Sequence, residues 1–163
     1  MAIARYYEVN GGLVPISAAT ALPLLYISTP STADTNILRL KVSVEAVSSP
    51  APPSNGSVYF SLNKVTGTKA GGAAVTATPT TSITLASNIT YSGGSTAITG
   101  LTQSTELWGA AVPFTSGAAW EDAYENTGLE IYLPVSSQFA MYVISPSGFS
   151  STCSARAILN TAE

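Results

Sequence analysis

Apolar and polar residues alternate with a period of two along several parts of the chain. The clearest segment is "ILRLKVSVEAV" (37–47), in which one face is apolar and the other carries charged residues and serine. The apolar face consists of Leu38, Leu40, Val42, Val44 and Ala46. A period of two over this length is typical of a strand with one buried face.

A second alternating segment follows a strong chain break. "SSPAPPSNGS" contains three prolines and the turn-forming pair Asn55-Gly56, and "VYFSLNKV" then places Val58, Phe60 and Leu62 on one face. Because consecutive strands usually lie side by side, these two segments are predicted to be neighbours in an antiparallel sheet.

The last third of the chain repeats the pattern. "ELWGAAVPF" predicts a strand that ends at Pro113, and three further strands are expected at 129–133, 139–144 and 153–159, separated by polar turns. Many short strands with little helical periodicity favour an all-β fold, an antiparallel β-sandwich or jelly roll.

Two segments fit this pattern less well. "TGTKAGGAAVTATPTTS" (66–82) is rich in Gly, Ala and Thr and is interpreted as a long surface loop, followed by short strands before residue 106. "AAWEDAYENTG" (118–128) places Trp120 and Tyr124 four residues apart, with Gly128 beyond them, which predicts one short helix.

The chain begins with a long stretch that carries no charge, between Glu8 and Asp34. Pro15, Pro23 and Pro30 interrupt it, which argues against a transmembrane helix, and Glu8 with the prolines also argues against a secretion leader. We therefore expect residues 1–33 to form an extended N-terminal arm or first edge strand, and residues 34–163 to form the β-sandwich domain. A neighbouring chain would bury the arm.

Charged residues are unusually scarce, at 9% of 163 residues, although 45% are hydrophobic. Ser and Thr make up about a quarter of the chain. A surface with so few charges resists self-association poorly, so we expect much of it to be covered in the working state. The net charge is -3 and the six basic residues are scattered, which predicts neither nucleic-acid binding nor membrane docking.

The residue types leave little room for catalysis. The chain has no histidine, and Cys153 is its only cysteine, interpreted as a small buried hydrophobe. We therefore predict no enzymatic activity, no catalytic residues and no cofactor. The four clustered carboxylates have no calcium-loop spacing and are interpreted as a solvated face, not as a metal site; they are Glu121, Asp122, Glu125 and Glu130.

Interface residues are expected in the N-terminal segment, where "RYYE" joins aromatic rings to charges before the uncharged stretch. The candidates are Arg5, Tyr6, Tyr7, Leu13, Val14, Ile16, Leu22, Leu24, Leu25 and Tyr26.

The long N-terminal stretch and the closing pattern "GLEIYLPVSSQFAMYVISPSGFSSTCSARAIL" (128–159) resemble the head decoration (cement) proteins of tailed bacteriophages. The resemblance implies a structural protein that is made in the host cytoplasm and stabilises the outside of the capsid of the virion. It implies the major capsid protein and copies of itself as partners, in a homotrimer.

Two alternatives remain open. One is a tail, neck or fibre component of the same kind of particle. The other is a carbohydrate-binding β-sandwich module that uses Trp108, Trp120 and Tyr124 to stack on sugars.

Overall fold

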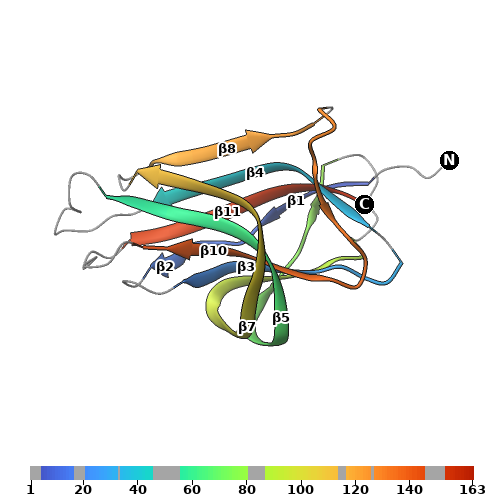
Figure 1. The fold of residues 1–163 in the computed structure, drawn as a ribbon, viewed down its shortest axis with the longest axis horizontal. Coiled ribbons are helices and arrows are strands. Elements are labelled where there is room, and N and C mark those ends of the chain that lie inside the picture. The colour runs from blue at the N-terminus through green and yellow to red at the C-terminus, as the bar shows by residue number, and fades with distance from the viewer. Residues whose placement is uncertain are drawn as a thin grey trace.

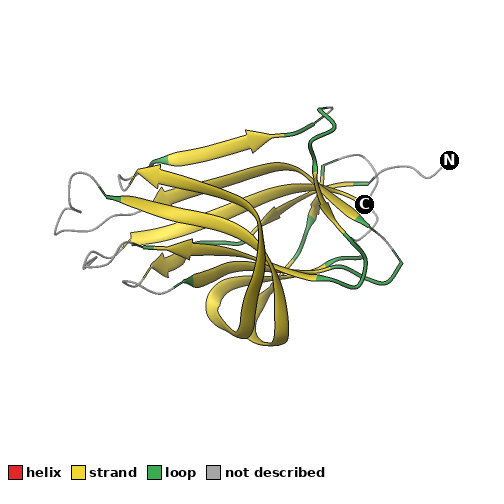
Figure 2. Ribbon diagram, in the orientation of Figure 1, coloured by secondary structure: helices red, strands yellow, loops and turns green. Residues whose placement is uncertain are grey.

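The computed structural model describes residues 5–16, 21–32, 34–45, 56–80, 87–113, 117–125, 127–145 and 153–163. These residues form eleven strands and contain no helix (Figures 1 and 2). The strands build two antiparallel sheets packed face to face, so the predicted all-β sandwich is confirmed.

The first sheet, sheet A, has the strand order β6-β1-β11-β4-β8, with β2 paired to β11 and β9 paired to β4. Its strands are β1 (Tyr6–Asn10), β2 (Val14–Ile16), β4 (Thr35–Glu45), β6 (Thr78–Pro79), β8 (Ala119–Ala123), β9 (Ile131–Leu133) and β11 (Cys153–Ala162). Strand β11 lies at its centre and alternates strictly between inward buried and outward half-buried residues.

The second sheet, sheet B, closes on itself in the order β10-β3-β7-β5. Its strands are β3 (Leu22–Ser28), β5 (Ser57–Val75), β7 (Thr90–Pro113) and β10 (Gln138–Ile144). Strand β10 pairs with both β3 and β5, while β7 pairs with β5 and, through its first residues, with β3. We call the long β5–β7 pair the curled ribbon, because it bends round to reach β3 (Figure 1).

Glycines make this bend possible. The pairing of β5 with β7 shifts register four times, and Gly67, Gly71 and Gly100 have positive φ in the bend. A Cβ on these glycines would lie 2.0–2.3 Å from a carbonyl oxygen of the opposite strand, so a side chain cannot fit. The predicted surface loop at 66–82 is therefore wrong over most of its described length: Gly and Ala here allow close strand approach, not disorder.

The curled ribbon explains why sheet B has two cores. The main core lies between the sheets and includes the inward residues Leu25 and Met141. A smaller cluster on the opposite face of sheet B joins β3 and β10 to the ribbon, through Tyr26, Val65, Ile98, Ala140 and Tyr142. Strands β3 and β10 are therefore buried on both faces.

The segments 37–45 and 58–65 are strands, whereas Ala46 and Val47 lie outside the described residues. The two strands are not neighbours as predicted. Strand β4 pairs with β11, β8 and β9 in sheet A, whereas β5 pairs with β10 and β7 in sheet B. Each strand has one apolar face, and placing them in opposite sheets lets the two faces bury each other across the sandwich.

The predicted helix at 118–128 is also wrong. Residues Ala119–Ala123 form the edge strand β8 along β4, and Thr127 N donates to Tyr124 O in a turn beyond it. Pairing with β4 over five residues holds the segment extended, and the exposed ion pair between Arg39 Nε and Glu121 Oε1, at 2.9 Å, adds little to it.

The N-terminal segment belongs to the body of the molecule and does not lie apart as an arm. Strand β1 pairs with β11 over five residues and with β6 over two, and β3 lies between β10 and β7. The described strands of this segment contribute to the core of the chain itself: Leu24, Leu25 and Ile27 are fully buried.

Candidate functional site

Several of the charged residues lie together on one face of the molecule. The outer face of sheet A carries the ion pairs Arg39–Glu121 and Arg156–Glu45, the latter at 3.1 Å, and Lys41 is exposed on the same face. Surface pairs of this kind contribute little stability, but they keep a surface hydrated and soluble.

The curled ribbon presents the opposite kind of surface. No charged residue occurs between Lys69 and Glu106 in the sequence. Lys64 on β5 and Glu106 on β7 are exposed at one end of this stretch. We define the uncharged ribbon surface as the exposed side chains of the ribbon beyond these two residues: Thr66, Thr68, Ala70, Ala73, Ala74, Thr96, Ala97, Thr99, Thr102, Gln103, Ser104 and Thr105. Lys69 lies within it, but its Nζ donates to Gly71 O at 2.7 Å and is 5.7 Å from the centre of the Tyr26 ring.

This surface is suited to contact with another molecule. Its backbone is held by the pairing of β5 with β7, so little main-chain freedom is left to lose on binding. Alanine has no side-chain rotamers to lose and threonine is stiff at χ1. An ordered surface with so little charge can therefore be covered at low entropic and desolvation cost.

The ten predicted interface residues do not form one surface. Six are buried in this chain itself: Tyr7, Val14, Ile16, Leu24, Leu25 and Tyr26. Arg5 and Leu22 are half-buried, and only Tyr6 and Leu13 expose a large part of their side chains. Of these candidates, Tyr6 lies at a groove.

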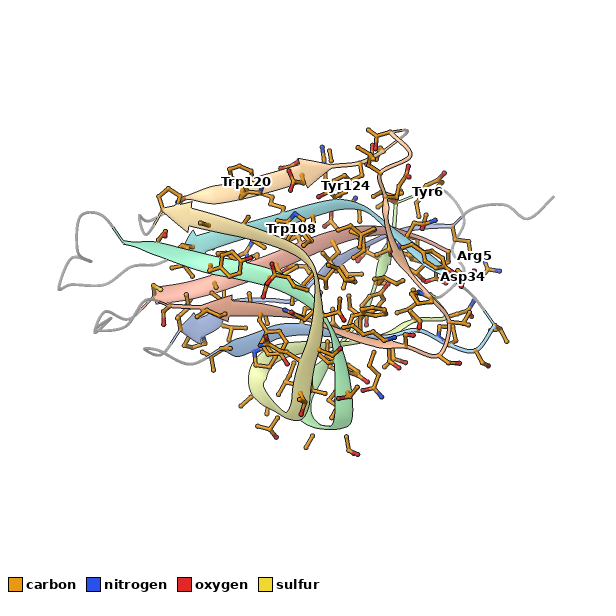
Figure 3. All side chains as sticks on the ribbon, in the orientation of Figure 1. Arg5, Tyr6, Asp34, Trp108, Trp120 and Tyr124 are labelled. Carbon is orange, nitrogen blue, oxygen red and sulfur yellow. The ribbon has the colours of Figure 1, made fainter. Side chains whose placement is uncertain are left out.

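The three aromatic residues proposed for sugar stacking lie close together, in different roles (Figure 3). Trp108 is buried, and its Nε1 donates to Oδ2 of Asp122 at 2.7 Å. Tyr124 donates its hydroxyl to the same oxygen at 3.2 Å, and burial with the nearby carboxylate raises its pKa. Trp120 is 46% exposed on the edge strand, so it is the one open ring of the three.

The four clustered carboxylates separate by role. Glu121 pairs with Arg39, Asp122 accepts from Trp108 and Tyr124, and Glu125 and Glu130 line a groove. Among the described residues, no group of three or more acidic or thiol side chains is placed to hold a metal ion.

Cys153 is buried at the start of β11, as predicted. Burial raises its pKa from 9.0 to about 11, which keeps the thiol protonated and unreactive at neutral pH.

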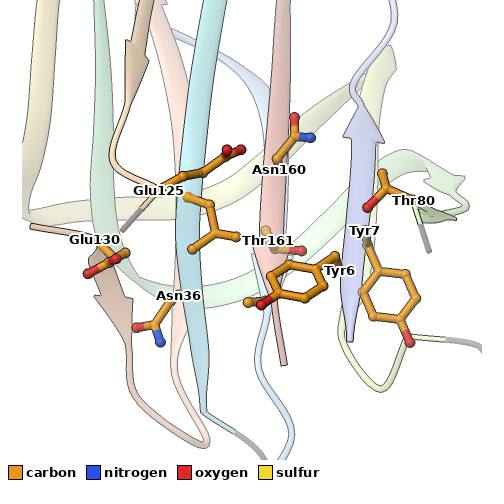
Figure 4. A pocket seen from close by; sticks show the side chains of 10 residues that line it. Tyr6, Tyr7, Asn36, Thr80, Glu125, Glu130, Asn160 and Thr161 are labelled. Atoms are coloured by element: carbon orange, nitrogen blue, oxygen red, sulfur yellow. The ribbon is translucent and has the colours of Figure 1, made fainter. Parts of the chain in front are cut away.

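The groove lies on the outer face of sheet A, where β1 begins and β11 ends, and has a volume of about 490 Å³ (Figure 4). Its lining includes two tyrosines, two carboxylates, two amides and two threonine hydroxyls: Tyr6, Tyr7, Glu125, Glu130, Asn36, Asn160, Thr80 and Thr161. Sequence reasoning missed it, because its residues come from five separate segments.

No family model, curated protein or solved structure matches this chain. The part of the chain that the structure describes contains no helix of the length and hydrophobicity needed to cross a membrane.

Proposed function

We propose that this chain is a non-enzymatic structural protein of a virus particle, which binds the outside of the capsid as a decoration protein and stabilises it. It docks on the major capsid protein, beside copies of itself, through the uncharged ribbon surface. The proposal keeps the function that the sequence resemblance implies and moves the contact surface from the N-terminal segment to the ribbon.

The observation that carries the proposal is the uneven distribution of charge. Sheet A exposes two ion pairs and Lys41, whereas the ribbon beyond Lys64 and Glu106 exposes mainly Thr, Ala, Gly and Ser, with Lys69 as the one charged residue. A large uncharged surface promotes association, and a particle lattice offers a partner that covers it permanently. The charged face of sheet A then faces the medium.

Many modest contacts fit this role better than one tight site. The uncharged ribbon surface offers hydroxyls, small apolar groups and a backbone that a partner can approach closely, because its side chains are short. None of its residues is a large aromatic anchor. Occupying several capsid subunits at once raises the overall affinity through effective concentration.

The test introduces charge into the ribbon of the full-length protein. Thr68→Glu with Thr102→Glu places two carboxylates on exposed neutral ribbon positions, and Asn10→Glu with Ala123→Glu places two carboxylates on exposed neutral positions of sheet A. Binding to undecorated heads is measured by co-sedimentation. We expect the ribbon variant to lose at least about tenfold in affinity, since burying unpaired charges is costly, and the control to bind as the wild type.

Equal binding of both variants would overturn the ribbon as the docking surface. Failure of the wild type to sediment with heads, or electron-microscopy density on the tail, neck or fibre, would overturn the decoration function and favour the alternative location.

A further inference from the structure

The groove on sheet A is a built feature with an ordered frame. Its floor is formed by outward residues of three neighbouring strands, Tyr6 of β1, Leu38 of β4 and Ala162 of β11. Thr80, Glu125 and Glu130 stand at its sides, from connections beyond strand ends (Figure 4).

Backbone hydrogen bonds fix the side of the groove that holds the aromatic ring. Thr80 N donates to Tyr6 O at 2.9 Å, so the hydroxyl and the ring are held relative to each other. Arg5 N donates to Glu163 O at 3.1 Å and Glu163 N donates back to Arg5 O at 2.9 Å. Strand β1, which carries Tyr6, is therefore held by two backbone hydrogen bonds at Arg5, the residue just before it.

The acidic side is fixed as well. Tyr124 N donates to Leu38 O at 2.7 Å, immediately before Glu125. Thr127 closes the turn with its backbone N and its hydroxyl, both donating to Tyr124 O, and the same hydroxyl accepts from Leu129 N next to Glu130. Hydrogen bonds thus hold the backbone at Tyr124 and Leu129, next to each of the two carboxylates.

The chemistry of the lining favours a neutral polyhydroxylated ligand. Tyr6 is 40% exposed and offers a ring face for the C–H side of a sugar, and the amides of Asn36 and Asn160 can each donate and accept. Carboxylates accept from hydroxyls without requiring a positive charge. A groove of about 490 Å³ is of the size that takes a small organic ligand.

Other ligand classes fit less well. The two carboxylates repel an anion such as a uronic acid or a phosphate. A metal ion is not favoured, because the described residues include no group of three or more acidic side chains placed to hold one and the exposed face of the Tyr6 ring offers a metal no ligand.

We propose that this groove binds a neutral saccharide, with the Tyr6 ring as the stacking surface and Asn36, Thr80, Glu125 and Asn160 as hydroxyl partners. The proposal is independent of head binding, because the groove lies on sheet A and the uncharged ribbon surface lies on β5 and β7. It also differs from the sugar site expected at Trp108, Trp120 and Tyr124, none of which lines the groove.

The test is an NMR titration of the full-length, ¹⁵N-labelled protein. Its probes are neutral oligosaccharides of hexoses, pentoses and N-acetylhexosamines, with a trigalacturonate and spermidine as the anionic and cationic comparisons. We expect at least one neutral oligosaccharide to shift the amide signals of Tyr6, Thr80 and Asn160 at millimolar concentration. Tyr6→Ala should weaken this binding about tenfold, because stacking and burial of one ring contribute on the order of 1–2 kcal/mol.

Two matched variants separate the proposal from its rivals. Tyr6→Phe keeps the ring and should retain saccharide binding, while Trp120→Ala removes an exposed ring outside the groove and should leave binding unchanged. The proposal is overturned if no neutral probe shifts the groove signals, if spermidine or trigalacturonate alone does so, or if the saccharide shifts depend on Trp120 instead of Tyr6.

Discussion

The indole Nε1 of Trp108 donates a hydrogen bond to Oδ2 of Asp122 at 2.7 Å, and this bond joins the two sheets at their edge. Trp108 lies on β7 of the curled ribbon, and Asp122 lies on the edge strand β8 (Figure 3). Strand β8 has only β4 as a neighbour in sheet A, so this side-chain bond ties it to the ribbon as well.

We expect Asp122→Ala to lower the free energy of unfolding by about 1–3 kcal/mol, because it leaves the buried indole N–H without its acceptor. Urea unfolding measures the loss. The adjacent variant Glu121→Ala is the control: it breaks an exposed ion pair with Arg39 and should cost less than about 1 kcal/mol. Equal losses for the two variants would show that the link to Trp108 does not stabilise the edge.

The bend of the curled ribbon should be the part of the molecule most sensitive to alanine. Gly67→Ala would place a Cβ at a position with positive φ and 2.3 Å from Gly100 O. We therefore expect it to lower the free energy of unfolding by at least about 1 kcal/mol more than the same substitution at a positive-φ glycine in open space. Gly128→Ala is that control, since φ is also positive there and nothing lies within 4 Å. Urea unfolding gives the energies, and faster amide hydrogen exchange at Val65 and Ile98 would locate the damage in the ribbon. Similar costs at both glycines would contradict the close approach of the strands.

Two buried tyrosines should respond in opposite ways to loss of the hydroxyl. The hydroxyl of Tyr142 is buried in the small cluster under the ribbon without a hydrogen-bond partner. Tyr142→Phe should therefore leave stability unchanged or raise it, because it removes an unsatisfied polar group. The hydroxyl of Tyr91 lies 3.3 Å from that of Thr161, and Tyr91→Phe should cost about 0.5–1.5 kcal/mol. Thermal unfolding of the two variants tests the difference, and a larger loss for Tyr142→Phe would reverse the assignment.

Strand positions could be predicted where one face of a strand meets the core and the other meets solvent. Val58, Phe60 and Leu62 are fully buried as the alternation indicates, and so are Ala155, Ala157 and Leu159. The alternation breaks at Leu38, where the pairing of β4 with β11 shifts register, so Ile37 becomes fully buried and Leu38 faces the groove. A bulge of this kind leaves no mark in a pattern of period two.

Sheet membership and the ribbon could not be predicted in the same way. The apolar face formed by Val58 and Phe60 indicates that one side of the strand is buried, but it does not indicate which sheet the strand joins. The ribbon was missed because its inward residues Val65 and Ile98 are separated by exposed Thr and Ala, which have no periodic apolar signal. The uncharged run from residue 70 to 105 was the available signal, since most of the uncharged ribbon surface lies within it.

Alkaline pH should weaken the fold through two buried acids of the core. Burial raises the pKa of Tyr91 from 10.0 to about 12, and burial raises the pKa of Cys153 from 9.0 to about 11. Both pKa values are higher in the folded state, so between pH 9 and 12 the unfolded chain loses protons that the folded chain keeps. The free energy of unfolding is therefore at its full value below about pH 9 and falls as the pH rises.

A pKa that is higher by about two in the folded state lowers the free energy of unfolding at high pH by at most about 2–3 kcal/mol for each group. Urea unfolding at pH 8, 10 and 11 should show this decline in the wild type. Cys153→Ala should flatten it mainly between pH 9 and 11, and Tyr91→Phe mainly above pH 10, because each variant removes one titrating group. A decline that is equally steep in the wild type and in the double variant would assign the alkaline sensitivity to other groups and contradict the burial of these two.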